Sequence, residues 1–223
     1  GYLLFITNSI HRGMEAMDGP INFGENDRFW GLVVEGYEEP PLYCHNYNPP
    51  YYKTLFENYG FRVYFNQFYY RLDLQATDVS RYKKLADRLA ERNKVIATGI
   101  DVRKSKKFAK DFCDVYNAAW ITHDNFKPMT EERMRALYKK MKPVIDPELM
   151  IFAYHEGKAI GMFLILPELN TIFKKIGKGK MNWFDKLRFL WLLRHGGTRR
   201  IFGFVFGVAR EWQKKGVESI MVM

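Results

Sequence analysis

The sequence has few cysteines and no long apolar run, and both absences narrow what it encodes. Only two cysteines, Cys44 and Cys113, occur among 223 residues. Two thiols build neither a disulfide framework nor a cysteine-rich zinc site, so we expect no metal centre and a reduced, cytoplasmic protein. No stretch approaches the roughly 20 apolar residues that cross a bilayer. The apolar residues 2–12 lack the basic segment that opens a secretory signal.

Glycine and proline are also too few and too scattered to dominate the chain. The 17 glycines and 9 prolines follow no period, which excludes a collagen-like or low-complexity protein. Hydrophobic residues make up 47% of the chain and aromatic residues 17%. That apolar content excludes an intrinsically disordered chain, because burial can offset the ordering entropy. The length fits one large domain or two small ones.

Acidic residues are outnumbered, and the imbalance is local. The formal net charge is +10, and residues 168–200 hold nine basic residues against two acidic ones. Such a cluster favours an anionic partner, which could be a phosphorylated cofactor, an acidic substrate, nucleic acid or a membrane surface. No known nucleic-acid-binding motif accompanies the cluster, so we expect no nucleic-acid partner.

Hydrophobic periodicity and turn residues predict a chain of mixed helices and strands. Helices are expected over 2–12, 50–60, 78–93, 104–120, 130–142 and 183–194, with Asn48 or Pro49 as the cap of the second. Strands are expected over 14–20, 61–74, 94–100 and 199–209, and residues 149–169 are expected to form a β-hairpin.

The C-terminal turn is the strongest candidate for a binding site. The apolar strand 201–208 runs into the turn 213–218, which opens a helix. A helix start offers unpaired N–H groups and the positive end of a dipole, which together bind phosphate. Gly216 would let the backbone approach a ligand, and Lys214 and Lys215 add positive charge.

The same turn resembles the pyrophosphate loop of the GNAT superfamily of acyl-CoA N-acyltransferases, Gln/Arg-x-x-Gly-x-Gly/Ala. The matching residues are Gln213, Lys214, Lys215, Gly216 and Val217, and Glu218 departs from the pattern. The resemblance implies an α/β fold, with a mixed, mostly antiparallel sheet flanked by helices. It also implies that residues 213–218 bind the pyrophosphate of acetyl-CoA or another acyl-CoA. The strand that ends at Val208 would then offer backbone groups to the pantetheine.

The first part of the chain resembles the closing part of the same fold. Its LFENYGF segment (55–61) is similar to the family's helix that ends in Gly-Phe, with Phe56 where a tyrosine often protonates the leaving thiolate. Residues 19–36 and 46–52 look like segments of large bacterial proteins with tandem acetyltransferase-like domains.

This resemblance implies an unusual domain order. Residues 1–76 would be the C-terminal half of one acyltransferase-like fold, and 77–93 a linker helix. Residues 94–223 would be the N-terminal part of another such fold, with a basic helical insertion over 168–199. Either the chain is a fragment of a longer protein, or 1–74 supply the closing strands of a permuted single sheet.

The resemblance implies transfer of an acetyl or other acyl group to a small-molecule or peptide amine. Glu168 and Glu35 are the carboxylates best placed to act as the base. Cys44 and His45 could be a nucleophile and its base, but adjacent side chains point apart in an extended segment, so we expect no catalysis there. His123 and Asp124 are expected to form a turn rather than an acid–base pair. The alternative function is that of a binding or structural module that has lost catalysis. The sequence leaves the oligomeric state open, including a homodimer.

The helix over 182–194 combines apolar and basic residues. Its spacing predicts that the apolar residues are partly buried while Lys186 and Arg188 are solvated. The apolar residues are Trp183, Phe184, Leu187, Leu190 and Trp191. We expect this helix to cover a sheet face, and the alternative is a helix that lies on a membrane.

Overall fold

The computed structural model describes residues 13–20, 31–122, 126–177 and 179–223. The chain divides into two compact units, residues 1–69 and 70–223. The helix expected over 2–12 lies outside the described residues, as do His123 and Asp124.

The second unit is built on a four-stranded sheet in the order β1-β2-β3-β4. The strands are β1 (Val95–Thr98), β2 (Met150–His155), β3 (Lys158–Pro167) and β4 (Ile201–Val208). Every neighbouring pair is antiparallel. The hairpin between β2 and β3 turns at Glu156 and Gly157, whose φ angles are 48° and 78°. The expected sheet, mostly antiparallel and flanked by helices, is therefore confirmed, and no parallel pair occurs among these four strands.

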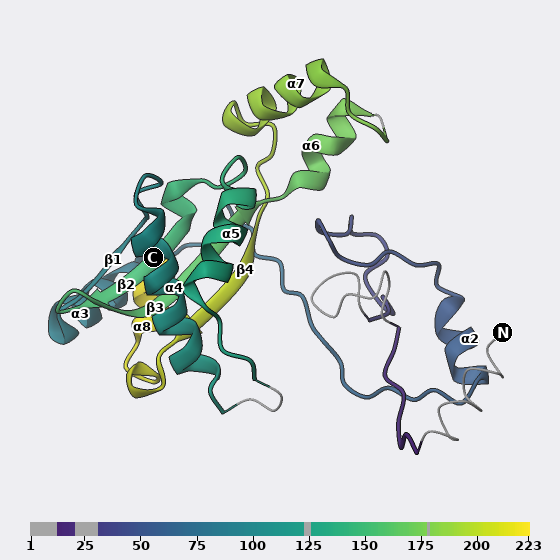
Figure 1. Ribbon diagram of the computed structural model, residues 1–223, viewed down its shortest axis with the longest axis horizontal. Coiled ribbons are helices and arrows are strands. Elements are labelled where there is room, and N and C mark those ends of the chain that lie inside the picture. The colour runs from purple at the N-terminus through teal and green to yellow at the C-terminus, as the bar shows by residue number, and fades with distance from the viewer. Residues whose placement is uncertain (1–12, 21–30, 123–125, 178) are drawn as a thin grey trace. The chain divides into compact units, whose positions relative to one another are not determined.

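Two pairs of helices cover the two faces of this sheet (Figure 1). On one face lie α4 (Ser105–Trp120) and α5 (Glu131–Met141), which pack on β2 and β3 through side chains such as Phe152. On the other lie α3 (Ser80–Asn93) and α8 (Val217–Val222), which pack on the neighbouring residue Ala153 and its surroundings. Adjacent strand residues point to opposite faces, which gives each helical pair its own core.

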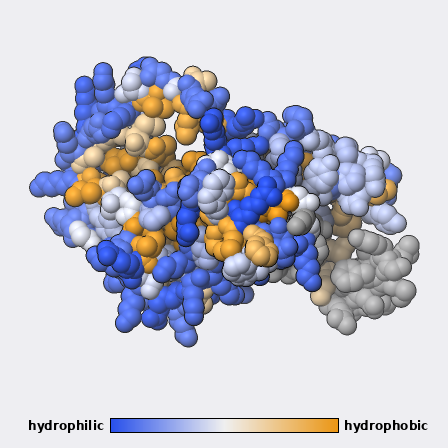
Figure 2. Space-filling model, turned by 90° about the horizontal axis from the view of Figure 1, so that it is seen from above, coloured by the Kyte–Doolittle hydropathy of each residue, from blue (hydrophilic) through white to orange (hydrophobic). Residues whose placement is uncertain are grey.

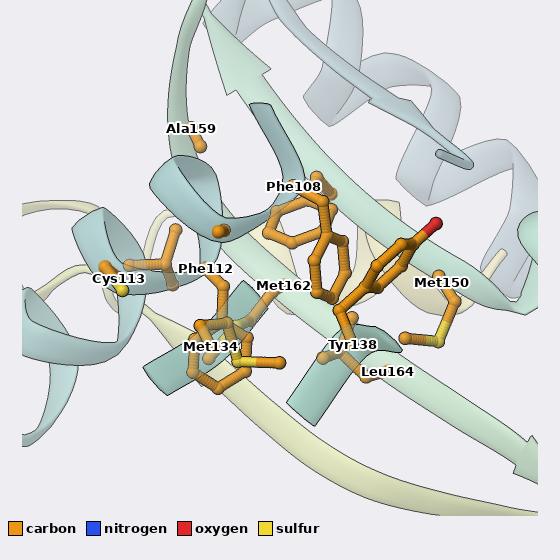
Figure 3. Close-up of a cluster of buried hydrophobic side chains, with 12 residues drawn as sticks. Phe108, Phe112, Cys113, Met134, Tyr138, Met150, Ala159, Met162 and Leu164 are labelled. Atoms are coloured by element: carbon orange, nitrogen blue, oxygen red, sulfur yellow. The ribbon is translucent and has the colours of Figure 1, made fainter. Parts of the chain in front are cut away.

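The core beneath α4 and α5 is aromatic at its centre and rich in methionine around it (Figure 3). The Phe108 ring lies 4.6 Å from the Tyr138 ring and 5.8 Å, edge to face, from the Phe152 ring. Phe152, Met150 and Met162 are fully buried. Burying each such side chain contributes about 1.5–3 kcal/mol, so this cluster holds α4 and α5 on the sheet.

The helix expected as a linker, α3, belongs to the second unit instead. It packs against α8 and β1, and its last residue, Asn93, donates from Nδ2 to the carbonyl of Lys215 at 2.8 Å. Its charged sequence misled the prediction because a narrow apolar stripe, including the buried Ala86, is enough to dock it.

A helical arm, residues 168–200, joins β3 to β4 (Figure 1). It contains α6 (Leu169–Ile176), which the sequence reading missed, and α7 (Trp183–Arg194), which it predicted. The two helices share a small core of their own. Its buried members are Leu169, Ile172, Ile176 and Phe189.

The first unit contains α2 (Tyr52–Asn58), as predicted. Asn48 is not its cap, because Tyr51 occupies the N-cap position. Instead, Asn48 is buried and accepts from the N–H of Val33 at 2.8 Å while its Nδ2 donates to the Val33 carbonyl at 3.1 Å. Asn48 therefore holds the preceding loop at Val33 instead of capping α2.

The strands expected over 14–20 and 61–74 are wrong, because the structure assigns no strand to either segment. Aromatic and β-branched residues favour strands mainly through packing on a half-buried pleated surface. In 61–74 that surface is missing, since Tyr64 and Tyr70 are 85% and 91% exposed. The four-stranded sheet is made only of residues from the second unit.

Candidate functional site

A pocket of about 380 Å³ lies at the C-terminal end of β4, within the second unit. Three elements form it: the end of α4, the last residues of β4 and the turn that leads to α8. The lining residues are Ala119, Trp120, Phe206, Gly207, Val208, Gln213, Lys214 and Glu218.

The turn folds back on the strand that precedes it. A short 3-10 helix, Arg210–Trp212, follows β4, and the Gln213 side chain then donates from Nε2 to the carbonyl of Val208 at 3.1 Å. Lys214 and Gly216 have φ angles of 61° and 81°, in the left-handed region. Glycine fits that region without strain, which explains why Gly216 can serve as the N-cap of α8.

The far side of the turn is fixed to α3. A Cβ atom added to Gly216 would lie 2.6 Å from Cδ1 of Leu89. The Lys215 ammonium lies 4.6 Å from the centre of the Trp212 ring, and Val217 is fully buried. Lys215, Gly216 and Val217 therefore build the turn, while Val208, Gln213, Lys214 and Glu218 line the pocket.

The pocket lining has few ionisable groups, but the positive end of the α8 helix dipole lies beside it. Lys214 and Glu218 are the two charged side chains among its lining residues. The N–H groups of residues 216–219 precede the first internal bond of α8, from Ile220 N–H to the Gly216 carbonyl at 3.3 Å. Glu218 lies in the first turn, where a carboxylate interacts favourably with the helix dipole but repels an anionic ligand.

An aromatic wall closes one side of the pocket, and the sequence reading missed it. A Cβ atom added to Gly207 would lie 2.5 Å from Cη2 of Trp120, so the indole lies directly on the strand backbone. Trp120 stacks on Tyr116 at 4.8 Å, and Tyr116 stacks on Phe112 at 5.6 Å. The i, i+4 spacing of these aromatic residues was visible in the sequence, but their position beside β4 was not.

Glu168, expected as a base, is the N-cap of α6. It is 3% exposed, and it accepts from the N–H groups of Asn170 and Thr171, each at 2.9 Å. The Thr171 hydroxyl donates a further bond at 2.9 Å. Glu168 is not among the residues that line the pocket. The carboxylate is thus engaged in a structural role.

The other expected carboxylate, Glu35, is exposed in the first unit. His45, which follows Cys44 in the sequence, packs its ring edge to face on Tyr69, at 4.7 Å between ring centres. Cys113 is a buried residue of α4, and burial raises the pKa of its thiol. Its low thiolate fraction makes it a packing residue rather than a nucleophile.

A second polar cluster lies where α4 meets β2. The Tyr154 hydroxyl donates to Oδ2 of the buried Asp111 at 2.6 Å, and the Lys107 ammonium donates to the Tyr154 oxygen at 2.7 Å. Burial and the bond to Asp111 raise the pKa of Tyr154. Burial alone would lower the pKa of Lys107, but its bonds to Asp111 and Tyr154 outweigh that and raise it. This cluster satisfies a buried carboxylate.

No group of three or more His, Cys, Asp or Glu side chains in 13–20, 31–122, 126–177 and 179–223 is arranged to hold a metal ion. Within the same ranges, no helix has the length and apolar content needed to span a membrane.

The chain is similar to two curated bacterial proteins. It is 28% identical over 205 residues to a protein named bacterial ceramide synthase from Caulobacter vibrioides, covering 91% of this chain and 52% of that protein. It is 22% identical over 215 residues to protein YghO of Escherichia coli, covering 95% and 54%. The chain thus spans about half the length of both relatives. No protein-family profile matches it.

Among solved structures, the chain is similar to a polyamine N-acetyltransferase of Drosophila melanogaster, with a TM-score of 0.30 and 11% identity over 57% of this chain and 66% of that one. It is also similar to an agmatine N-acetyltransferase variant, with a TM-score of 0.29 and 12% identity over 56% and 68%. Scores this low assign neither a family nor a reaction.

Proposed function

We propose that this chain carries the acyl-CoA-binding part of an N-acyltransferase. The observation that supports the proposal is the pocket at the end of β4, where a left-handed turn, a cation and a helix start meet. Its volume, about 380 Å³, is within the usual range of small-molecule sites. Residues 213–217 of the turn match the pattern that the GNAT superfamily uses for the pyrophosphate of acyl-CoA, and Glu218 departs from it.

Each part of the pocket has a role in this proposal. Lys214 and the amides at the start of α8 bind the pyrophosphate by charge and hydrogen bonding. β4 is at the edge of the four-stranded sheet, so one side of its backbone can pair with an extended chain of amides such as pantetheine. Trp120 shields that contact from water.

The acceptor is proposed to be an amine. An alkylammonium group with a pKa near ~10.4 is neutral about once in 2,500 molecules at pH 7, so the site must remove a proton or desolvate the amine. A ceramide is a fatty amide of a long-chain amino alcohol, so the name of the Caulobacter relative favours a long-chain amine over a polyamine as acceptor.

The proposal is tested by titration calorimetry of the full chain with acetyl-CoA, a long-chain acyl-CoA and free CoA. We expect binding of at least one acyl-CoA and a loss of roughly tenfold in affinity for Lys214→Ala, because one charge-assisted bond is removed. Lys140→Ala on α5 is the matched control, since it removes an exposed lysine that does not line the pocket. Equal affinity in both variants would place the anion site elsewhere.

A binding module without catalysis is the second candidate. It is favoured by one observation: the Glu168 carboxylate is engaged as a helix cap, which leaves Glu218 as the carboxylate in the pocket lining. Release of free thiol from acyl-CoA separates the two functions. Release that depends on an added long-chain amine supports the enzyme, whereas binding without amine-dependent release supports the module.

A further inference from the structure

Helix α7 has two apolar faces, and only one of them is used inside the arm. Phe189 is buried against α6, where its ring stacks on Phe173 at 5.2 Å. On the other side, four large apolar side chains are in solvent. These are Trp183 at 66%, Phe184 at 73%, Leu187 at 47% and Trp191 at 58% exposed. The expectation of partial burial is therefore wrong for these four residues, and it is confirmed for Leu190, which packs against the small core of the arm.

The exposed apolar residues form one stripe. At about 100° per residue, Trp183, Leu187 and Trp191 follow one another along the same side of the helix, and Phe184 adjoins them. The buried Asp185 and Phe189 lie on the opposite side. A helix that is apolar on two sides is usually buried in a protein core or packs its second side against another apolar environment, such as a membrane. Figure 2, seen from the side where α6 and α7 lie in Figure 1, shows hydrophobic residues exposed among strongly hydrophilic ones.

Cations lie beside the stripe on α7. Lys186, Arg188 and Arg194 are exposed on α7 itself, and no ion pair joins them to an acid in the part of the chain that the structure describes. Further exposed cations of the arm are Lys174, Lys175, Lys180 and Arg199.

The arm's two acidic residues are both turned inward to cap helices. Glu168 caps α6. Asp185 is buried and accepts from the Asn182 N–H at 3.1 Å, while the Asn182 side chain accepts from the Asp185 N–H at 2.9 Å. The outer surface of the arm therefore presents cations and aromatic rings together, without an opposing carboxylate.

We propose that the arm docks on an anionic phospholipid surface, with the stripe 183–191 inserted at the level of the headgroups. Tryptophan prefers that boundary because its ring is apolar and its N–H is polar. The lysines and arginines beside the stripe contact lipid phosphates and are attracted by the surface potential. The inference is independent of the proposed acyl transfer.

The same observations disfavour two other occupants. A second copy of this chain would bring the cations of both arms face to face. Nucleic acid would match the charge, but it offers no apolar phase for Leu187 or Phe184. A lipid surface satisfies the charge and the apolar stripe at once.

The test is co-sedimentation of the full chain with vesicles of phosphatidylcholine alone, and with equimolar phosphatidylcholine and phosphatidylglycerol. We expect binding to the anionic vesicles that weakens with salt without vanishing, because insertion of the stripe is not screened. Lys186→Glu with Arg188→Glu should reduce the binding constant by roughly tenfold or more. Lys139→Glu with Lys140→Glu, an equal charge change at exposed positions of α5, is the control and should bind better than the arm variant.

Tryptophan fluorescence gives a second readout, and its control variant replaces tryptophan by phenylalanine so that the arm stays apolar. We expect the emission of the wild-type chain to shift to the blue on the anionic vesicles, and the shift to disappear in Trp183→Phe with Trp191→Phe. Equal binding to neutral vesicles, equal loss in the α5 control, or a blue shift that persists without both tryptophans would overturn the proposal. So would the absence of vesicle binding together with self-association through the arm.

Discussion

Gly216 and Leu89 are in such close contact that no side chain fits between them: a Cβ atom on Gly216 would lie 2.6 Å from Cδ1 of Leu89. From the sequence, we expected the missing side chain of Gly216 to let a ligand approach the backbone. In the structure, it instead lets the turn pack closely on Leu89 of α3. A substitution at Gly216 therefore acts on packing before it acts on binding.

The first prediction follows from that contact. Gly216→Ala should lower the free energy of unfolding by at least about 1–2 kcal/mol, because the left-handed backbone is strained and the methyl group meets Leu89. Gly196→Ala is the control, since Gly196 has a φ of 75° and nothing within 4 Å of an added Cβ. Denaturant titration should show the smaller loss for Gly196→Ala. Leu89→Ala combined with Gly216→Ala should recover part of the difference, and strictly additive losses would contradict the contact.

The second prediction concerns the carboxylate in the pocket. Glu218→Gln should strengthen acyl-CoA binding by roughly two- to fivefold, because it removes a negative charge beside the proposed phosphate site at partial exposure. Calorimetry at two salt concentrations should show the gain shrinking as salt rises. A weaker complex would mean that Glu218 helps to hold the ligand or its amine.

The third prediction concerns the wall of the pocket. Gly207→Val should abolish most acyl-CoA binding, since its Cβ would displace Trp120 from the strand. Gly203→Val on the same strand is the control, because its Cβ would meet Phe163 at 2.9 Å rather than a pocket residue. Binding measured in both variants, with circular dichroism to confirm folding, should separate the two. Equal loss would point to β4 itself rather than to the pocket.

The fourth prediction separates the two roles considered for Glu168. Glu168→Ala should lower the melting temperature, because two N–H groups and a hydroxyl lose their acceptor, at a cost of about 1 kcal/mol or more. Acyl-CoA affinity should be unchanged. If the wild type releases thiol and Glu168 is its catalytic base, Glu168→Ala should instead remove one limb of the pH–rate profile and leave the melting temperature unchanged.

The fifth prediction concerns alkaline pH. The pKa of Tyr154 is raised above its ordinary 10.0, and that of Lys107 above its ordinary 10.5. A raised folded pKa contributes stability that is complete below the ordinary value and is lost as pH rises through the folded one. The free energy of unfolding should therefore fall above about pH 10. Tyr154→Phe should flatten that fall, and Tyr82→Phe, at an exposed tyrosine of α3, should leave it unchanged.

Local sequence signals predicted most of the second unit. The apolar spacing of α4 and α5 was sufficient, since their burial pattern repeats with the period of a helix. The Glu156–Gly157 turn was recognised from its turn residues, and β4 was recognised from its continuous apolar run. The same signals failed over 61–74, because a β-rich composition forms a strand only beside a partner. They also failed at α6, whose N-cap is a glutamate rather than one of the usual capping residues.

The site was predictable only in part. The Gln213–Gly216 turn was visible as a local motif, and the structure places Gln213 and Lys214 on the pocket. Trp120 and Leu89 come from helices far away in sequence, and no local pattern says which of them faces the turn. The two sides of α7 were confused for a similar reason, since both are apolar and periodicity does not say which one finds a neighbour.

The way the arm is attached has a consequence for how it could be moved. β3 ends and β4 begins at a directly paired position, Pro167 opposite Ile201, and the Glu168 N–H donates to the Arg200 carbonyl at 2.9 Å just beyond it. The arm thus enters and leaves at one point, as a long loop does at the tip of a hairpin, and it carries its own small core. We therefore expect that a short turn could replace the arm without changing the register of β3 and β4. We also expect that the arm would keep its surface properties when it is grafted onto another hairpin.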